Sequence, residues 1–280
     1  MSGKYKIAMI YDFDGTLAPG NMQEYDFIPA VGKKNEEFWQ ESTQMANDQD
    51  GDTILAYMYK MIKGAQSGDI SLRREAFRES GSKVQLFKGV EQWFSRINSY
   101  AALRGLEVEH YINSSGIKEM IEGTKIAHEF KKIYACSFFY NIDGVAFWPS
   151  VVVNYTNKTQ FLFKINKGIE SVSDNVLINK YIPEEKRAIP FKRMIYIGDG
   201  HTDIPCMRLV KQMEGYSIAV YSPSSPAKVD EIAKLVEDKR VNYVAEADYT
   251  EGGKIDMLVH GIIDKIAAEV HLKIFEDENI

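Results

Sequence analysis

The stretch KIAMIYDFDGT, residues 6–16, decides the fold. After Lys6 it is continuously apolar as far as Tyr11, which is the pattern of a strand buried on both faces. Asp12 and Asp14 follow at once, and side chains two residues apart in an extended chain face the same way. Two carboxylates so close repel each other unless a cation lies between them, and a hard divalent cation such as Mg²⁺ prefers such oxygen ligands. Taken alone, the pair also fits a polar turn after a strand.

Three later segments have the same sequence pattern, a short apolar run that stops at a polar or glycine-containing turn. They are Glu107–Ile112, Arg193–Ile197 and Tyr216–Tyr221. Helical periodicity flanks them, most clearly at Val90, Trp93, Phe94 and Ile97. Apolar strands that alternate with amphipathic helices predict an α/β fold with a doubly wound parallel sheet, in which ligands bind beyond the carboxyl ends of the strands.

Residues 18–88 do not follow this alternation of strands and helices, because they contain no convincing buried strand. Apolar residues from Ile54 to Ile62 recur at helical spacing, with Asp52 or Thr53 available as N-cap. We therefore expect a mostly helical second domain over residues 18–88, inserted after the first strand of a core formed by residues 1–17 and 89–280. Within that core, Asp143-Gly144 between two aromatic or β-branched runs predicts a hairpin over residues 138–153, and residues 255–270 have an amphipathic helical pattern.

A second acidic cluster, GDGHTD at residues 198–203, follows the strand that ends at Ile197. The glycines around Asp199 let the backbone approach a ligand closely, and Asp203 lies about one helical turn further on. By itself the segment fits a tight strand-to-helix turn. Two acidic clusters at the same edge of one sheet predict a metal–carboxylate centre.

Two further features bear on the same edge. Ser114 and Ser115 follow another strand, where hydroxyls and N–H groups at a helix N-terminus suit phosphate oxygens, although Ser114 could also act as an N-cap with Glu119 as its reciprocal partner. Lys167, in the segment INKG, supplies a cation for a negatively charged group in transfer. A single lysine is nearly always a solvated surface residue, so this assignment depends on the pattern of all four elements together.

These four elements, in this order, resemble the haloacid dehalogenase (HAD) superfamily, and the resemblance spans roughly residues 5–225. Its first motif resembles residues 12–16, its second Ser114, its third Lys167, and its fourth Asp199 with Asp203. The setting of the lysine and the GDGxxD signature are most similar to the phosphoserine phosphatase branch, and an insertion after the first strand resembles a C1-type cap. One departure is the opening of that insertion, APGNMQ at residues 18–23, which lacks the early acidic residue of that branch.

The resemblance implies a Rossmann-like HAD core and a Mg²⁺-dependent phosphatase that hydrolyses a small phosphate monoester. It implies that Asp12 forms an aspartyl-phosphate and that Asp14 is the general acid and base. The metal would be held by Asp12, Asp199, the backbone carbonyl of Asp14 and, in support, Asp203. The residues implied to bind the substrate phosphate are Thr16, Ser114, Ser115 and Lys167.

A phosphotransferase or mutase on the same scaffold remains an alternative. A phosphoacceptor module similar to a response-regulator receiver is a second one, although receivers are much shorter and lack a seventy-residue insertion.

The composition bears on which partners the protein can bind. The 34 basic and 40 acidic residues give a net charge of −6, so we expect it to bind neither nucleic acid nor a membrane surface. Two cysteines without CxxC spacing, and no long apolar run, predict a cytoplasmic protein. The family resemblance implies that its partner is a small phosphorylated metabolite.

Overall fold

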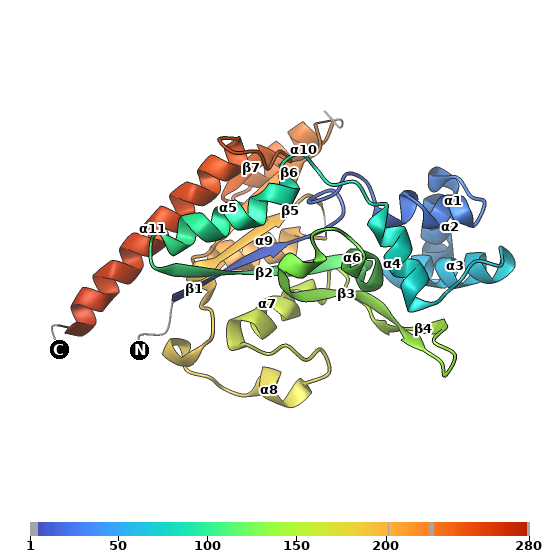
Figure 1. Ribbon diagram of the computed structural model, residues 1–280, viewed down its shortest axis with the longest axis horizontal. Helices are drawn as coiled ribbons and strands as arrows, with labels where there is room; N and C mark the ends of the chain where they lie inside the picture. Colours follow the sequence, from blue (N-terminus) through green and yellow to red (C-terminus); the bar gives the residue numbers. More distant parts are fainter. Residues whose placement is uncertain (1–4, 201, 224–226, 279–280) are drawn as a thin grey trace.

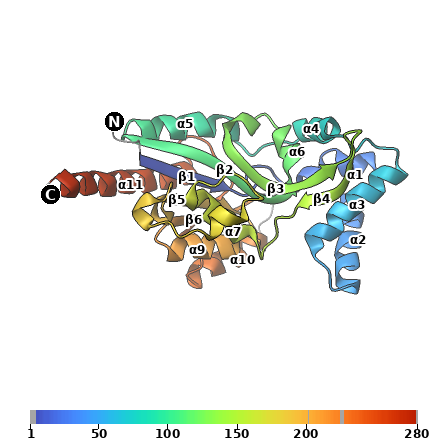
Figure 2. The ribbon, with the colours of Figure 1, turned by 90° about the horizontal axis from the view of Figure 1, so that it is seen from below.

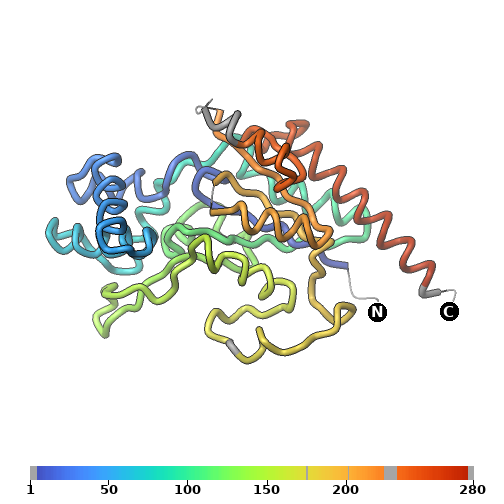
Figure 3. Tube along the Cα trace, turned by 180° about the vertical axis from the view of Figure 1, so that it is seen from behind, coloured from blue at the N-terminus to red at the C-terminus, as the bar shows by residue number. Residues whose placement is uncertain are grey.

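A computed structural model describes residues 5–200, 202–223 and 227–278. His201, within the second acidic cluster, therefore lies outside the described residues. In Figure 1 an α/β core forms one side of the molecule, and a group of helices from the blue part of the chain stands beside it. The start of β1 and the later turns of the last helix lie at the end of the core away from those helices (Figure 3).

The core is built on a seven-stranded sheet of order β4-β3-β2-β1-β5-β6-β7. All neighbouring strands pair in parallel except β3 and β4, which form an antiparallel hairpin. This confirms the doubly wound α/β fold and the hairpin at Asp143-Gly144. The strands are β1 (Tyr5–Tyr11), β2 (Leu106–Ile117), β3 (Phe130–Tyr140), β4 (Ala146–Val151), β5 (Met194–Gly198), β6 (Tyr216–Tyr221) and β7 (Tyr243–Glu246).

Helices cover both faces of the sheet, with α5 on one side and α7 and α9 on the other (Figure 2). The predicted apolar stripe of α5 is fully buried, as expected for a helix that packs on a buried sheet. The C-terminal helix is longer than its apolar pattern predicted. The core helices are α5 (Val90–Ala102), α6 (Lys118–Glu122), α7 (Lys158–Lys167), α8 (Asn175–Asn179), α9 (Ile204–Gln212), α10 (Ala227–Glu237) and α11 (Lys254–Glu278), with short 3-10 turns at Ala127–Glu129, Glu184–Lys186 and Phe191–Arg193.

The segment between β1 and α5 is helical, as the sequence predicted. Asp52 caps α3 by accepting hydrogen bonds from the N–H groups of Ile54 (2.8 Å) and Leu55 (2.9 Å). We call α1–α4 the helical insertion; the domain boundaries at 18 and 88 stay a prediction. Its elements are a 3-10 turn at Met22–Glu24, α1 (Phe27–Ala30), α2 (Asn35–Asp48), α3 (Thr53–Ser67) and α4 (Arg74–Ser82).

The segment around Ser114 differs from the expectation. Strand β2 continues through Ser114 and Ser115 to Ile117, so these serines lie in a strand and not at a helix N-terminus. Glu119 forms no capping box, because one of its carboxylate oxygens accepts from the Ser137 hydroxyl at 2.6 Å. The helix that follows, α6, has only five residues. Side-chain packing against the hairpin has overridden the local capping signal.

Candidate active site

The ends of β1 and β5 bring the two acidic clusters together. The N–H of Asp12 donates to the carbonyl of Ile197 at 2.9 Å, so the chain leaving β1 is held against the end of β5. Carboxylate oxygens of Asp12, Asp199 and Asp203 all lie within 4.8 Å of one another. The predicted convergence of acids far apart in the sequence is therefore observed for these three residues.

Asp12 is 6% exposed and its carboxylate is held from two sides. One oxygen accepts from the N–H of Phe13 at 2.7 Å. The other lies 3.2 Å from the ammonium of Lys158, which is completely buried. These two contacts fix the direction of the carboxylate.

The lysine of the site is Lys158, so the assignment of Lys167 to it was wrong. The Lys167 ammonium donates to the carbonyls of Ile178 (2.5 Å) and Lys180 (2.8 Å), in the segment after α7. Lys158 stands at the first position of the same helix and Lys167 at the last. Nine residues of helix separate the two by about 13 Å, so only one of them can reach the sheet edge.

Asp203 orients Lys158. It is fully buried, and one of its oxygens accepts from the Lys158 ammonium and from the Tyr196 hydroxyl, both at 2.6 Å. Its other oxygen accepts from the N–H of Gly200 at 3.2 Å. With both oxygens engaged in this way, Asp203 serves mainly to hold the lysine and the turn around Asp199 in place.

Asp14 faces the same cavity as Asp12 and is held differently. One of its carboxylate oxygens accepts from the N–H of Met22 at 2.8 Å. Burial, and then the charge of Asp12, raise the pKa of Asp14 well above its usual value. A raised pKa favours the protonated form of the carboxyl group, which is the form that a general acid needs.

Burial and neighbouring charges also shift the pKa values of Asp12 and Lys158. Burial first, then the charge of Asp203, raise the pKa of Asp12 to about 7. Burial alone would lower the pKa of Lys158, but the carboxylates of Asp12 and Asp203 outweigh it and raise that pKa above its usual value. The lysine is therefore a cation, and a further cation beside Asp12 would favour the ionised form of its carboxyl group.

Gly15 is required for the approach of Asp199. Its φ is +71°, and a Cβ at this position would lie 2.1 Å from Asp199 Oδ2. The DxDGT stretch thus ends in a turn that leaves room for the carboxylate of the other cluster. This explains the glycine in physical terms, where the sequence indicated only a turn.

A cavity of about 490 Å³ opens over these residues. Its lining includes Asp12, Asp14 and Asp199 from the core, together with residues of the helical insertion. The Tyr57 hydroxyl, on α3, reaches across to donate to the carbonyl of Ser115 at 2.5 Å. The full wall consists of Asp12, Asp14, Gly15, Pro19, Gly20, Asn21, Gln23, Trp39, Ile54, Tyr57, Ser114, Ser115, Gly116, Asp199, Thr202 and Ser222.

The three hydroxyl residues expected to bind phosphate divide into two groups. Ser114 and Ser115 line the cavity, and a hydrogen bond from Ser114 is one of the influences that lower the pKa of Asp12. Among the described residues, the buried Ser115 hydroxyl has no hydrogen-bond partner. Thr16 is completely buried and is not part of the wall, so the structure gives it no access to a substrate phosphate.

The donor set fits a hard divalent cation. Asp12 and Asp199 both line the cavity and present carboxylate oxygens, the ligand type that Mg²⁺ prefers. The side chain of Asp14 does not belong to this cluster, and its backbone carbonyl as a ligand stays a prediction. The acidic cluster is therefore compatible with a metal ion.

Sequence reasoning missed Lys158 and the insertion residues that close the cavity. A topological signal for Lys158 exists: α7 begins at Lys158, soon after the hairpin. Lys158 meets Asp12 and Asp203 at the carboxyl edge of the sheet, whereas the end of α7 shares a pocket with Lys6, near the start of β1. Trp39 and Tyr57 give no such signal, because aromatic residues at helical spacing more often form a core.

Comparison with known proteins agrees with this geometry. The model of the haloacid dehalogenase-like hydrolase family matches residues 9–208. The chain belongs to this family, and it is a hydrolase. An uncharacterized protein of Borreliella burgdorferi is 32% identical over 291 residues, covering 94% of this chain and 98% of that protein.

Solved structures of the same fold are more distant in sequence. A HAD family hydrolase from Salmonella enterica serovar Typhi has a TM-score of 0.56 at 14% identity, covering 90% of this chain and 69% of that one. A phosphoserine phosphatase described as a phospho-aspartyl intermediate analogue has a TM-score of 0.52 at 15% identity, covering 86% and 93%. At such identities the likeness establishes the fold. In the part of the chain that the structure describes, no helix is both long and apolar enough to cross a membrane.

Proposed function

We propose that this hydrolase is a Mg²⁺-dependent phosphatase that cleaves a small phosphate monoester through an aspartyl-phosphate on Asp12. The observation that carries the proposal is the position of the Asp12 carboxylate, in the lining of the cavity and 3.2 Å from a buried lysine. That arrangement offers a fixed nucleophile beside a fixed cation, with hydroxyl donors nearby. It is the set of groups that phosphoryl transfer requires.

In the first step, a carboxylate oxygen of Asp12 attacks phosphorus and the bond from phosphorus to the alcohol oxygen breaks. Asp14 gives its proton to the departing alkoxide, which leaves as the alcohol. In the second step, Asp14 takes a proton from water, and that water attacks phosphorus and releases inorganic phosphate and the Asp12 carboxylate. One difficult displacement thus becomes two easier ones.

Lys158 and Ser114 hold the phosphoryl oxygens during both steps and offset the charge that spreads over them. Lys158 takes the role that the sequence pattern had given to Lys167. Asp12 and Asp199 would hold Mg²⁺, with Asp203 in support. The ion supplies positive charge for the phosphoryl oxygens and lets Asp12 and the substrate phosphate approach each other without repulsion.

The helical insertion acts as the cap of the site. Trp39, Ile54 and Tyr57 form part of the cavity wall, and the cavity volume suits a small ester. Closure of such a wall excludes water and selects the substrate. The substrate in this proposal is a phosphorylated metabolite. We place the enzyme in the cytoplasm, because its two buried, unpaired thiols suit a reducing compartment.

Phosphate release from p-nitrophenyl phosphate tests the proposal. We expect activity with Mg²⁺, its loss in excess EDTA, and its loss in Asp12→Asn with the fold intact. Asp14→Asn should slow turnover strongly; on an aryl phosphate, whose leaving group needs no proton, only the first step should be spared, so that phospho-enzyme accumulates. Activity that survives EDTA would remove the metal from the mechanism. Adding an alcohol acceptor to the same assay separates transfer from hydrolysis, and a panel of phosphorylated metabolites then identifies the ester.

A further inference from the structure

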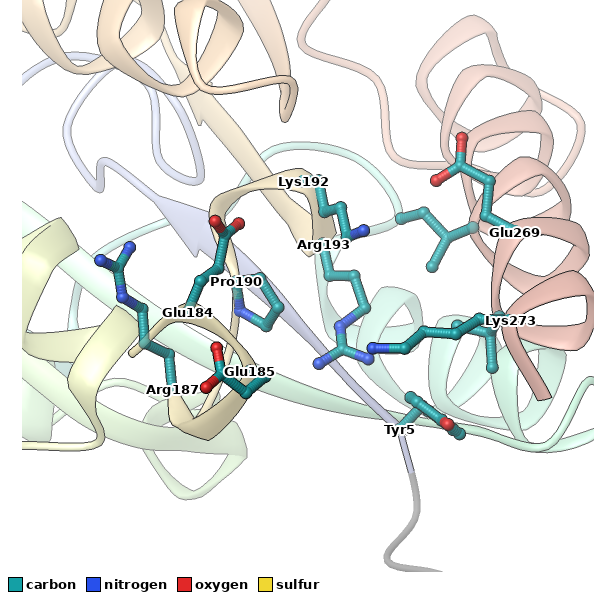
Figure 4. Close-up of a pocket in the computed structure, with 11 residues that line it drawn as sticks. Tyr5, Glu184, Glu185, Arg187, Pro190, Lys192, Arg193, Glu269 and Lys273 are labelled. Atoms are coloured by element: carbon teal, nitrogen blue, oxygen red, sulfur yellow. The ribbon is translucent and has the colours of Figure 1, made fainter. Parts of the chain in front are cut away.

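A second cavity, of about 330 Å³, opens between the segment before β5 and the later turns of α11 (Figure 4). Arg193, at the end of a 3-10 turn, and Lys273, on α11, reach into it above the ring of Tyr5. The wall consists of Tyr5, Glu184, Glu185, Arg187, Pro190, Lys192, Arg193, Ile266, Glu269, Val270 and Lys273. None of these residues belongs to the catalytic cavity.

Arg193 is the unusual member of this wall. Its guanidinium lies over the Tyr5 ring, 5.3 Å from the centroid, and its Nε is buried. Among the described residues, that Nε has no hydrogen-bond acceptor and the guanidinium has no carboxylate within ion-pair distance. Burial lowers the pKa of Arg193, which is the direction expected of a cation that lacks a counter-ion. A buried donor without an acceptor is costly to the free protein.

Lys273 adds a second positive charge from the opposite side. In Figure 4 its ammonium and the Arg193 guanidinium point toward one another, with Lys192 at the rim. Like charges that converge in this way repel, so an anion between them would relieve the repulsion. The planar guanidinium fork matches a carboxylate in geometry.

The net charge of the residues that line the cavity determines which charge on the anion is favoured. Arg187, Lys192, Arg193 and Lys273 face three carboxylates, Glu184, Glu185 and Glu269, which leaves one positive charge in excess. That excess favours a monoanion over a dianion such as phosphate. The Tyr5 ring, Pro190, Ile266 and Val270 offer apolar surface for the rest of the molecule. We propose that this cavity binds a small organic monocarboxylate with an apolar body, its carboxylate between Arg193 and Lys273.

The proposed site is separate from the catalytic one. Tyr5 begins β1 and Asp12 follows its end, so seven residue steps of strand, about 23 Å, separate the two cavities. Strand β1 therefore contributes a residue to one cavity at its start and leads into the other at its end. Failure of the phosphatase proposal therefore leaves this inference intact, and the reverse also holds.

The Arg193 Nε–H signal in a proton–nitrogen correlation spectrum reports on the site directly, since Arg193→Met identifies it by removing it. Benzoate is the probe, and benzyl alcohol, of nearly the same shape without charge, is its control. Inorganic phosphate forms a third arm, with EDTA present and ionic strength held constant. The variants are Arg193→Met and Lys273→Met, with Lys265→Met as a matched charge removal elsewhere on α11, where Lys265 lies over Tyr216.

We expect benzoate to shift the Arg193 signal with saturation, and benzyl alcohol and phosphate to leave it unmoved. Calorimetric dissociation constants for benzoate should rise about tenfold or more in Arg193→Met, as for loss of a charged hydrogen bond, and severalfold in Lys273→Met. Lys265→Met should change them by less than about twofold, because Lys265 is exposed, does not line the cavity, and its charge is screened by solvent. No saturable shift with benzoate, a phosphate shift in place of it, or equal weakening in Lys265→Met would each overturn the proposal.

Discussion

Replacement of Lys158 by methionine should abolish most of the activity while the same change at Lys167 should not. The two lysines stand at opposite ends of α7. Only the Lys158 ammonium contacts the aspartates, at 3.2 Å from Asp12 and 2.6 Å from Asp203. Methionine keeps much of the length of the side chain and removes the charge, so the pair of variants isolates the electrostatic contribution.

The expected magnitude follows from the Asp12–Lys158 distance of 3.2 Å. At an effective dielectric constant of about 20, that separation gives a gross attraction of about 5 kcal/mol, which the cost of burying the charges offsets in part. Removing one partner of a buried ion pair costs about 3–5 kcal/mol in the free energy of unfolding. Loss of a charge that stabilises a transition state lowers kcat by about 10²–10³-fold.

Phosphate release from p-nitrophenyl phosphate with saturating Mg²⁺ provides the assay, at a temperature at which near-ultraviolet circular dichroism finds each variant folded. Lys167→Met loses two hydrogen bonds to backbone carbonyls and should lose about 1–3 kcal/mol of stability, with kcat within about twofold of wild type. A folded Lys158→Met that keeps kcat, or a Lys167→Met that loses it, would refute the assignment of the lysine.

Three further results are expected. Burial raises the pKa of the Cys136 and Cys206 thiols to about 12, so a disulfide reagent near neutral pH should find no reactive thiol in the native protein and two after denaturation. Tyr57→Phe removes a hydrogen bond from the helical insertion to the core and should raise KM about two- to tenfold with a smaller change in kcat; an unchanged KM would remove Tyr57 from closure. Without metal, the folded protein keeps the Asp12 proton, with its pKa raised to about 7, whereas the unfolded chain loses it near pH 4. The free energy of unfolding in EDTA should therefore fall between about pH 4 and 7 more steeply in wild type than in Asp12→Asn, and equal slopes in denaturant titrations would contradict the burial of this charge.

The sheet could be predicted from the sequence because each strand carries its own signal. Apolar runs that stop at Asp12 and Gly198 need a parallel sheet buried on both faces, and parallel strands bring their carboxyl ends to one edge. The meeting of Asp12 with Asp199 follows from that topology alone. The cap of α3 by Asp52 is equally local, and the sequence predicted it for the same reason.

Features that depend on packing between distant segments escaped prediction. Lys158 is recognisable only once α7 is placed, because a lysine at either end of the helix looks alike in the sequence. Glu119 matches a capping box locally, yet in the structure it bonds Ser137 of the neighbouring strand. The aromatic wall of the cavity, with Trp39 and Tyr57, depends on how the insertion docks, which short-range periodicity does not encode.

The claim most open to direct measurement is that the substrate phosphoryl group passes onto Asp12. Acyl phosphates are reduced by borohydride, which converts the aspartate that carries them to homoserine. The enzyme, with Mg²⁺ and substrate, is quenched during turnover, reduced and digested, and the peptides are sequenced by mass spectrometry; Asp14→Asn should raise the yield by slowing the second step. The account predicts homoserine at position 12 alone. Homoserine at another aspartate, or none at any position while phosphate is released, would contradict it.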